Sequence, residues 1–188
     1  MKTLIKKDFD VDQEVKKVWA FLLQPELVVD CVPGVSIDEK IAEGRYKGFV
    51  GMKFGPIQAN YDAEIIYDDI NEDNQTIKLM GKGVDTKGMG SAEMQLTLRL
   101  EPTDDGCHVD SDMEIIINGK IAQFGSRLIQ NVSNQLFEQF VANFTKILKG
   151  YEISEKDKNV SAGGVLKTVF KGMFNNSNQE KGKASEKK

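Results

Sequence analysis

Hydrophobic and polar residues alternate along most of the chain between positions 46 and 117. One register is apolar, while the other carries charged side chains such as Asp62, Glu93 and Asp112. Alternation with period two is typical of antiparallel strands that bury one face and expose the other to water. Turn compositions such as Gly55-Pro56 separate these runs. The pattern predicts seven strands, over residues 3–11, 35–42, 46–54, 59–67, 75–84, 92–100 and 107–117.

Helical spacing of apolar residues replaces this alternation in three segments. Residues 12–24 carry an apolar stripe that begins after Asp12, a good N-cap residue, and ends before Pro25. A second helical turn is predicted over residues 26–31. From Ile121 to Lys149, apolar residues recur every three to four positions without a proline, which predicts one helix of roughly 43 Å.

The order of these elements defines a fold class. One strand, two short helices, six strands and a long helix correspond to the α+β helix-grip arrangement. In that arrangement a seven-stranded antiparallel sheet wraps around the C-terminal helix, and an internal hydrophobic cavity lies between the two. We therefore expect residues 1–150 to form a helix-grip ligand-binding domain.

Four glycines, Gly81, Gly83, Gly88 and Gly90, lie in or beside two predicted strands. They do not form a dinucleotide-binding loop, because such a loop joins a strand to a helix. Glycine inside a strand marks a bend or a bulge, and the missing side chain can also leave room for a ligand. Sheet curvature and ligand space both remain open interpretations.

The apolar register of the strands is rich in methionine. Apolar stripes usually form the core, but methionine beside aromatic residues also suits a pocket that fits an extended apolar ligand. Trp19, on the first helix, is predicted either to line the rim of such a pocket or to pack in the core. The other candidate lining residues are Met52, Phe54, Tyr61, Met94 and Met113 on the strands and Phe124, Leu128 and Val132 on the long helix.

Charge is distributed unevenly along the chain. The 188 residues have a formal net charge of -4. Residues 151–188 contain eight lysines and five acidic residues, a charge of +3, which leaves -7 for residues 1–150. An acidic body argues against nucleic acid as the main partner, because phosphate binding requires a basic excess. The N-terminus lacks the apolar core of a signal peptide, and no segment reaches the roughly 18 apolar residues of a spanning helix, so we expect a cytoplasmic protein.

The basic tail contains one amphipathic segment. After a polar linker at residues 151–164, residues 165–175 place an apolar stripe at helical spacing beside Lys167 and Lys171. A helix this short is marginal alone in water, so it needs a surface that buries the stripe. A membrane surface is the favoured candidate, and a partner protein or the chain's own domain are the alternatives. Residues 176–188 are predicted to be a disordered lysine-rich end. The stripe consists of Val165, Leu166, Val169, Phe170, Met173 and Phe174.

The sequence offers little for catalysis or metal binding. Its one histidine, His108, follows Cys107 in a predicted strand, where neighbours point to opposite faces, so His108 cannot activate that thiol. His108 falls on the charged register, which predicts a solvent-exposed strand residue. One histidine and two distant cysteines, Cys31 and Cys107, provide no zinc or iron ligand set. We predict no catalytic residues and no metal site.

Four sequence motifs resemble one known family. They are Asp-Cys-Val-Pro-Gly at residues 30–34, Gly-Phe-Val-Gly-Met-Lys-Phe-Gly-Pro-Ile at 48–57, Gly-Lys-Gly-Val-Asp-Thr-Lys-Gly-Met-Gly-Ser-Ala at 81–92 and Gly-Lys-Ile-Ala-Gln-Phe-Gly-Ser-Arg at 119–127. In this order they resemble the CoxG family of carbon monoxide dehydrogenase accessory subunits, within the START/polyketide-cyclase (SRPBCC) superfamily. The resemblance implies the helix-grip fold and favours an internal cavity over a filled core.

The resemblance also implies a function. The family is associated with molybdenum hydroxylases such as carbon monoxide dehydrogenase, and it implies recruitment of such an enzyme to the membrane and carriage of a quinone or lipid. We therefore expect a non-catalytic carrier and adaptor that is peripherally associated with the cytoplasmic membrane. Two alternatives remain. One is an assembly or maturation factor that carries no ligand, and the other is a polyketide-cyclase-like enzyme that uses Tyr61, Tyr67 or Asp85.

Overall fold

The computed structural model describes residues 1–54 and 57–151, without the side chains of Phe54 and Ile57. The amphipathic segment predicted at 165–175, the lysine-rich end at 176–188 and all of the linker after Tyr151 therefore lie outside the described residues.

Seven strands form one antiparallel sheet in the order β1-β7-β6-β5-β4-β3-β2. This confirms the seven strands that the alternation predicts, and β2 has the predicted bounds. The β4, β6 and β7 strands extend further than predicted, because their ladders continue into the polar hairpin ends. The strands are β1 Lys2–Val11, β2 Val35–Ala42, β3 Arg45–Phe54, β4 Ile57–Asn71, β5 Thr76–Asp85, β6 Gly90–Thr103 and β7 Gly106–Gly119.

Two short helices follow β1, namely α1 (Val15–Leu22) and α2 (Pro25–Cys31). The prediction that Asp12 caps the first helix was wrong, since Glu14 occupies the N-cap position. The chain bends first, with the Gln13 N–H donating to the Val11 carbonyl at 2.8 Å, so the helical turn begins two residues later. Pro25 does not merely end α1 but opens α2, where its fixed φ suits the first helical turn.

The predicted long helix is divided in two. A 3-10 turn, η1 (Ile121–Phe124), precedes α3 (Gly125–Leu148). Gly125 has a φ of 80°, a conformation that interrupts regular helical geometry and that residues with a Cβ rarely adopt. The expectation of one uninterrupted helix over 121–149 was therefore wrong at its start, although a 24-residue helix remains.

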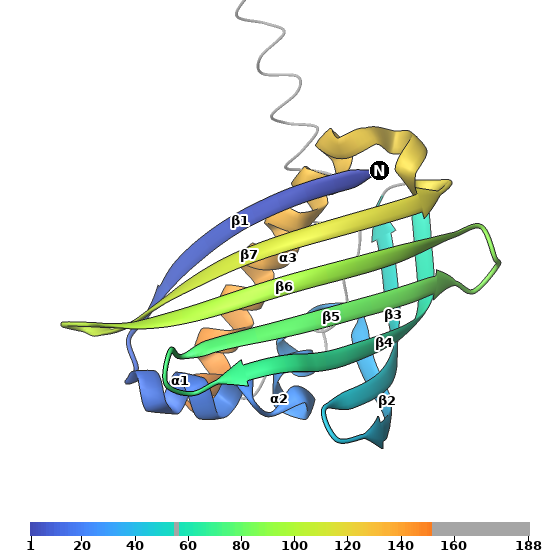
Figure 1. Cartoon of the computed structure of the whole chain (residues 1–188). Coiled ribbons are helices and arrows are strands. Elements are labelled where there is room, and N and C mark those ends of the chain that lie inside the picture. The colour runs from blue at the N-terminus through green and yellow to red at the C-terminus, as the bar shows by residue number, and fades with distance from the viewer. Residues whose placement is uncertain (55–56, 152–188) are drawn as a thin grey trace, which may run out of the picture.

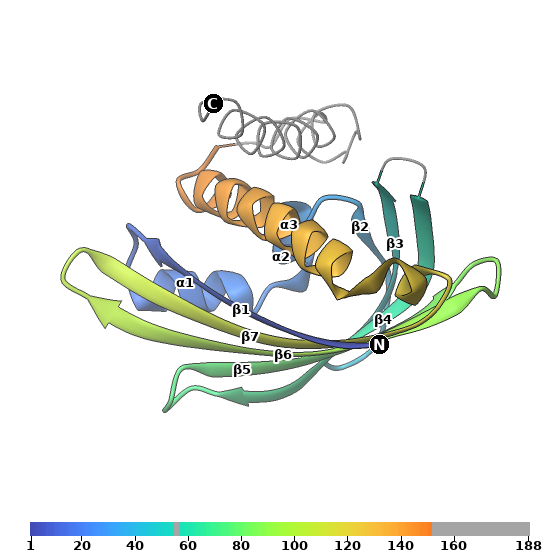
Figure 2. The ribbon, with the colours of Figure 1, turned by 90° about the horizontal axis from the view of Figure 1, so that it is seen from above.

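The sheet curls around α3, which lies across its concave face (Figures 1 and 2). Register shifts in β2 and between Tyr67 and Asp69 of β4 mark the bends that this curvature requires. Gly48 lies at one such place, because a Cβ there would come within 1.9 Å of the Ser36 carbonyl oxygen. Helices α1 and α2 cover one end of the concave face, beside the C-terminal half of α3 (Figure 2).

The main core lies at this covered end. Phe144 of α3 is fully buried and its ring contacts the rings of Phe9, Phe21 and Phe140. We call this core the packed end. It consists of Val11, Val18, Trp19, Phe21, Leu22, Cys31, Ile77, Leu100, Cys107, Val109, Phe144 and Leu148.

Candidate ligand-binding face

Strand register determines which side chains line the concave face of the sheet. Met94 of β6 is paired with Gly81 of β5 and Ile115 of β7, while Met113 of β7 is paired with Leu96 of β6. Paired residues in neighbouring strands point to the same side. These strands therefore present a continuous apolar surface toward α3, as the alternating sequence predicts.

The part of this surface near the beginning of α3 is only half-buried. Apolar side chains there retain contact with solvent, although they face the helix. Protein cores are normally close-packed, so partial exposure at inward positions indicates surface that another apolar molecule can cover. We call this part the half-buried region. It consists of Val50, Met52, Ile65, Met94, Leu96, Met113 and Ile115 from the sheet, with Leu128, Val132 and Leu136 from α3.

The structure brings five of the predicted lining residues into this region: Met52, Met94, Met113, Leu128 and Val132. Tyr61 lies on the same face of β4 but is buried. The side chain of Phe54 is outside the described part of the structure. The role of these residues in binding a ligand stays a prediction, but their placement on one concave face is what that prediction requires.

Trp19 and Phe124 lie elsewhere. Trp19 belongs to the packed end, which is the packing alternative rather than the rim of a pocket. Phe124 precedes α3 in η1 and is 51% exposed, so it does not face the sheet from within a long helix. The 3-10 turn rotates Phe124 out of the stripe that regular helical spacing would give it.

Tyr61 and Asp85 are neighbours across β4 and β5. Burial, and secondarily the nearby Asp85 carboxylate, raise the pKa of the Tyr61 phenol, which therefore stays protonated near neutral pH. No hydrogen bond to the Tyr61 hydroxyl occurs within residues 1–54 and 57–151. The Oδ1 atom of Asp85 accepts the backbone N–H groups of Lys87 and Met89, at 2.9 and 3.2 Å. Asp85 thus shapes a turn, and Tyr61 is a hydrogen-bond donor beside the apolar face.

Tyr67, the other tyrosine considered for catalysis, has a structural role. Its hydroxyl donates to the Leu22 carbonyl oxygen at 3.1 Å and ties β4 to α1. Burial raises the pKa of this phenol far above its usual value of 10. Tyr67 therefore cannot serve as a general base near neutral pH.

The strand glycines make room for protein side chains. A Cβ at Gly81 would lie 3.2 Å from the terminal methyl carbon of Met94, and one at Gly83 would lie 3.3 Å from the Cβ of Tyr61. The side chains of Met94 and Tyr61 therefore lie over these two glycines. This answers part of the open question on Gly81 and Gly83, since neighbouring side chains occupy the space nearest to each.

Thr3 is a polar residue of the concave face that the sequence interpretation missed. It is 5% exposed, and its hydroxyl has no hydrogen-bond partner in the described part of the chain. An unsatisfied buried hydroxyl costs about 1–3 kcal/mol. The signal was present in the alternation of β1, which places Thr3 in the same register as Ile5 and opposite Ile115.

The Cys-Val-Pro-Gly motif has a structural explanation. Cys31 is fully buried, and burial together with the Asp30 charge raises the pKa of its thiol to about 12. Its carbonyl oxygen accepts the side-chain N–H of Asn143 in α3 at 3.3 Å. Gly34 has a φ of 78°, and a Cβ there would come within 2.2 Å of the Gly51 carbonyl oxygen. The motif anchors α2 to α3 and the following turn to β3, and the thiol is unreactive.

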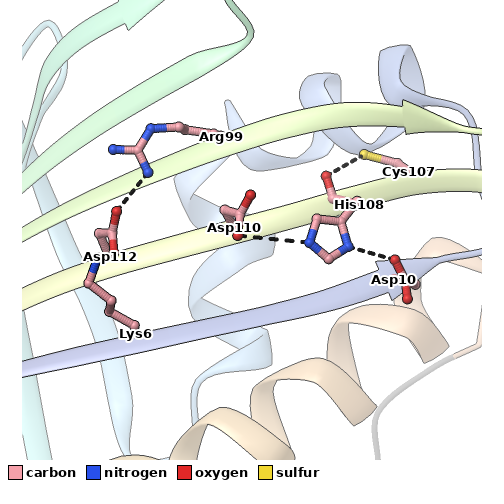
Figure 3. A network of polar contacts seen from close by, with 7 residues as sticks. All are labelled: Lys6, Asp10, Arg99, Cys107, His108, Asp110 and Asp112. Atoms are coloured by element: carbon pink, nitrogen blue, oxygen red, sulfur yellow. Dashed lines mark hydrogen bonds and ion pairs between the residues drawn. The ribbon is translucent and has the colours of Figure 1, made fainter.

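The convex face of the sheet carries a ladder of ion pairs (Figure 3). His108 Nδ1 lies 2.7 Å from an Asp10 carboxylate oxygen, and Asp112 accepts a hydrogen bond from Arg99 at 2.7 Å. Cys107 is buried while His108 is on the outer side, which confirms that the two side chains point to opposite faces. Within the described ranges, no cluster of three potential metal ligands occurs.

No helix within residues 1–54 and 57–151 is long and apolar enough to cross a membrane.

Solved structures share this architecture. A conserved protein from Geobacillus kaustophilus is 24% identical with a TM-score of 0.69, and the match covers 80% of this chain and 96% of that one. Norcoclaurine synthase from Thalictrum flavum is 15% identical with a TM-score of 0.56, over 80% of this chain and 88% of that one. The Zhui aromatase/cyclase from a Streptomyces species is 11% identical with a TM-score of 0.50, over 80% and 93%. The chain is thus a helix-grip protein of the SRPBCC superfamily.

Sequence comparison defines the family within that class. The model of the CoxG family, whose name denotes the G-type subunit of carbon monoxide dehydrogenase, matches residues 8–149. The chain belongs to the CoxG family, as its four motifs indicate. No curated protein matches it.

Proposed function

We propose that this protein is a non-catalytic carrier that binds a hydrophobic molecule, such as a quinone or lipid, between the sheet and α3. The observation that supports this proposal is the half-buried region, an apolar and methionine-rich surface on the concave face of a CoxG-family domain. Covering such surface stabilises a complex by about 25 cal/mol per Å² of apolar area removed from water. Methionine side chains adapt to ligands of varied shape.

Tyr61 supplies a polar group for such a ligand. Its phenol is buried, protonated and without a hydrogen-bond partner among the described residues, so it can donate to a carbonyl oxygen. A quinone has such an oxygen at the end of an apolar molecule. We expect Tyr61→Phe to weaken binding of a menaquinone probe by about tenfold, since one hydrogen bond contributes about 1 kcal/mol and an unpaired buried group costs more.

Extraction of the native protein tests ligand binding. The full chain is purified without detergent, extracted with organic solvent and analysed by mass spectrometry, and menaquinone is then titrated into the extracted protein. We expect a co-purified lipid or quinone, and saturable binding of the probe. Val132→Phe, which fills the half-buried region, is expected to abolish binding, whereas Ile70→Phe on an exposed strand end is the matched control. Absence of any extracted ligand together with absence of probe binding would overturn the proposal.

Association with a molybdenum hydroxylase such as carbon monoxide dehydrogenase is the second part of the proposal. The family to which the chain belongs supports it. The measurement is co-sedimentation of the purified full chain with a purified carbon monoxide dehydrogenase complex, with and without bound menaquinone. Co-sedimentation of a chain that binds no ligand would favour an assembly or maturation factor instead. Lack of co-sedimentation in both states would remove this part.

Membrane association through the tail is the third part. The stripe at residues 165–175 lies outside the described residues, so the sequence alone supports its role. Flotation of the full chain with vesicles containing phosphatidylglycerol is compared with that of Val169→Ser/Phe170→Ser, and Val160→Ser in the linker is the control. We expect the double substitution to reduce flotation and the control to leave it unchanged. Equal flotation of all three would exclude the tail.

A cyclase-like enzyme is the alternative, and the solved enzymes with this fold are its only support. The two tyrosines and the aspartate considered for it are a buried donor, a structural donor and a turn residue. Turnover of an aromatic polyketide-like substrate that is lost in Tyr61→Phe would establish this alternative.

A further inference from the structure

Four exposed cations surround the end of the sheet at which α3 begins. Lys53 is the penultimate residue of β3, Lys87 lies in the turn between β5 and β6, Lys120 lies between β7 and η1, and Arg127 is in the first turn of α3. We call these four residues the basic rim. They come from four segments that are distant in the sequence, so only the fold brings them to one end of the molecule.

Backbone contacts join these segments. The Lys120 N–H donates to the Met89 carbonyl oxygen at 3.1 Å, which links the start of η1 to the turn between β5 and β6. Tyr61 of β4 is paired with Asp85 at the end of β5, which places the adjoining ends of β3 and β4 beside the same turn. Figures 1 and 2 both show the end of β3, the β5–β6 turn and η1 on the side where α3 begins.

Almost no acidic residue offsets the charge of the basic rim. Residues 49–61, 86–92 and 115–137 contain no aspartate or glutamate. Asp85, which borders them, is 8% exposed and directs its Oδ1 to backbone N–H groups. No ion pair of the four cations occurs in the described part of the chain. The rim therefore presents positive charge directly to its surroundings.

The opposite end of the sheet is acidic. Residues 8–14, 68–74 and 101–106 carry four, four and three acidic residues and no lysine or arginine. These segments meet at one end, because Val11 is paired with Cys107 and the Leu100 N–H donates to the Gln75 carbonyl oxygen. The charge of -7 on residues 1–150 thus conceals a separation, with positive charge at one end of the fold and most of the negative charge at the other.

An exposed aromatic residue lies within the basic rim. Phe124 is 51% exposed and is located between Lys120 and Arg127 along η1 and α3. Exposed apolar residues flanked by lysine and arginine are typical of surfaces that settle into the interface of an anionic bilayer. Leaving a phenylalanine in water has no benefit for folding, so its position suggests contact with an apolar phase.

We propose that the basic rim and Phe124 form a docking surface for bilayers that contain anionic phospholipids. Docking directs the concave face and the beginning of α3 toward the membrane and the acidic end away from it. The inference rests on the proposed function only in taking the bilayer as the source of the ligand, and it does not require the tail.

The tail can reach the same bilayer. α3 has 24 residues and spans about 36 Å, and the described chain ends near its C-terminus, at the acidic end. The 14 residues from Tyr151 to Val165 span at most about 49 Å when extended. The apolar stripe of the tail and the basic rim are therefore able to contact one membrane together.

A matched charge substitution in the full chain tests the proposal. Lys87→Gln/Lys120→Gln/Arg127→Gln removes three rim cations, and Lys16→Gln/Lys17→Gln/Lys47→Gln removes three exposed cations elsewhere, so both variants change the net charge equally. Binding is measured to vesicles of phosphatidylcholine with 30 mol% phosphatidylglycerol and to vesicles of phosphatidylcholine alone. Each lysine or arginine near an anionic surface changes partitioning about fivefold. We expect the rim variant to lose more than tenfold and the control variant to lose less than threefold.

Three outcomes of this experiment would overturn the proposal. They are equal losses in the two variants, no loss in either, or an equal loss of the rim variant on neutral vesicles. Unchanged vesicle binding with weakened binding to carbon monoxide dehydrogenase would assign the rim to an acidic protein partner. Menaquinone binding by the rim variant is measured in parallel, so failure of docking is distinguishable from failure of the proposed carrier function.

Orientation is tested separately by fluorescence quenching. Phe124→Trp places an indole in the basic rim, and Ile70→Trp places one at the acidic end on a residue that is 48% exposed. Vesicles with brominated phosphatidylglycerol quench only indoles that enter the bilayer, and the signal of Trp19 is subtracted using the unmodified chain. We expect quenching of the indole at position 124 and none at position 70. Equal quenching, or stronger quenching at position 70, would overturn the proposed orientation.

Discussion

The packed end and the half-buried region belong to the same sheet and the same helix, yet they differ in how completely they exclude water. At the packed end, Phe144, Val109 and Cys107 are fully buried beneath α1 and α2. In the half-buried region, Met94, Met113 and the facing residues of α3 keep part of their surface exposed. The difference arises because α1 and α2 cover only one end of the concave face.

This contrast indicates a division of labour within one domain. The packed end supplies the free energy that holds the sheet against α3, because it removes large aromatic surfaces from water. The half-buried region contributes less to folding and leaves apolar surface for another molecule. Stability and ligand binding can therefore be altered separately, and the following substitutions test that separation.

The largest expected effect is at Phe144. Phe144→Ala removes a fully buried ring that contacts three other phenylalanines, and we expect a loss of about 3–5 kcal/mol in the free energy of unfolding. Leu128→Ala, in the half-buried region, should cost only about 1–2 kcal/mol, because less surface returns to water. Urea denaturation measures both. Equal losses would contradict the contrast between the two regions.

Added volume should have opposite consequences in the two regions. Val109→Phe overpacks a fully buried site and should destabilise the fold by about 1–3 kcal/mol. Val132→Phe places the same ring on a half-buried residue of α3, and should cost less than about 1 kcal/mol while it blocks menaquinone. Thermal unfolding and menaquinone titration are the two measurements. A Val132→Phe variant as unstable as Val109→Phe would indicate that the half-buried region is already filled.

The two tyrosines of β4 offer a smaller comparison. Tyr67→Phe removes the hydrogen bond to the Leu22 carbonyl oxygen and should lower the free energy of unfolding by about 1 kcal/mol. Tyr61→Phe removes a hydroxyl without a partner in the described part of the chain, and should leave stability within about 0.5 kcal/mol. Urea denaturation of the ligand-free protein distinguishes them. A larger loss for Tyr61→Phe would show that its hydroxyl supports the fold.

The smallest expected effect lies on the convex face. The Asp10 carboxylate, through its hydrogen bond, raises the pKa of His108 above the ordinary value of 6.5. Protonated His108 therefore stabilises the folded state fully below about pH 6.5, and this contribution is lost as pH rises through the raised pKa. An NMR titration should show the raised midpoint, and Asp10→Asn should lower it. Asp110→Asn should have a weaker effect, since its carboxylate lies 3.8 Å from Nε2. An unchanged midpoint in Asp10→Asn would contradict the assignment.

Much of the fold was predictable because it depends on local periodicity. The alternation of apolar and charged residues defines all seven strands, and the same alternation separates Cys107 from His108. The break in the long helix was less predictable, since Gly125 adopts a positive φ only in the context of the preceding turn. Phe124 was misplaced for this reason, because one irregular turn changes the direction of every side chain before it.

The candidate site was only partly predictable. Met52, Met94 and Met113 follow from the register, because period two places them on the inward face. Trp19 did not, because helical spacing shows that a residue is apolar on one side but not which end of the sheet that side covers. The basic rim was also absent from the sequence interpretation, since its four cations come together only through strand pairing.

The sequence by itself determined the strands, the presence of a long C-terminal helix, the helix-grip class and the family, because these depend on periodicity and on motifs within short segments. Tertiary structure alone decided which inward residues are fully buried and which remain half-exposed, since burial depends on where α1 and α2 lie. It also decided that the charges separate toward opposite ends. Pairing between distant strands sets both properties, and pairing partners are not encoded in any one segment.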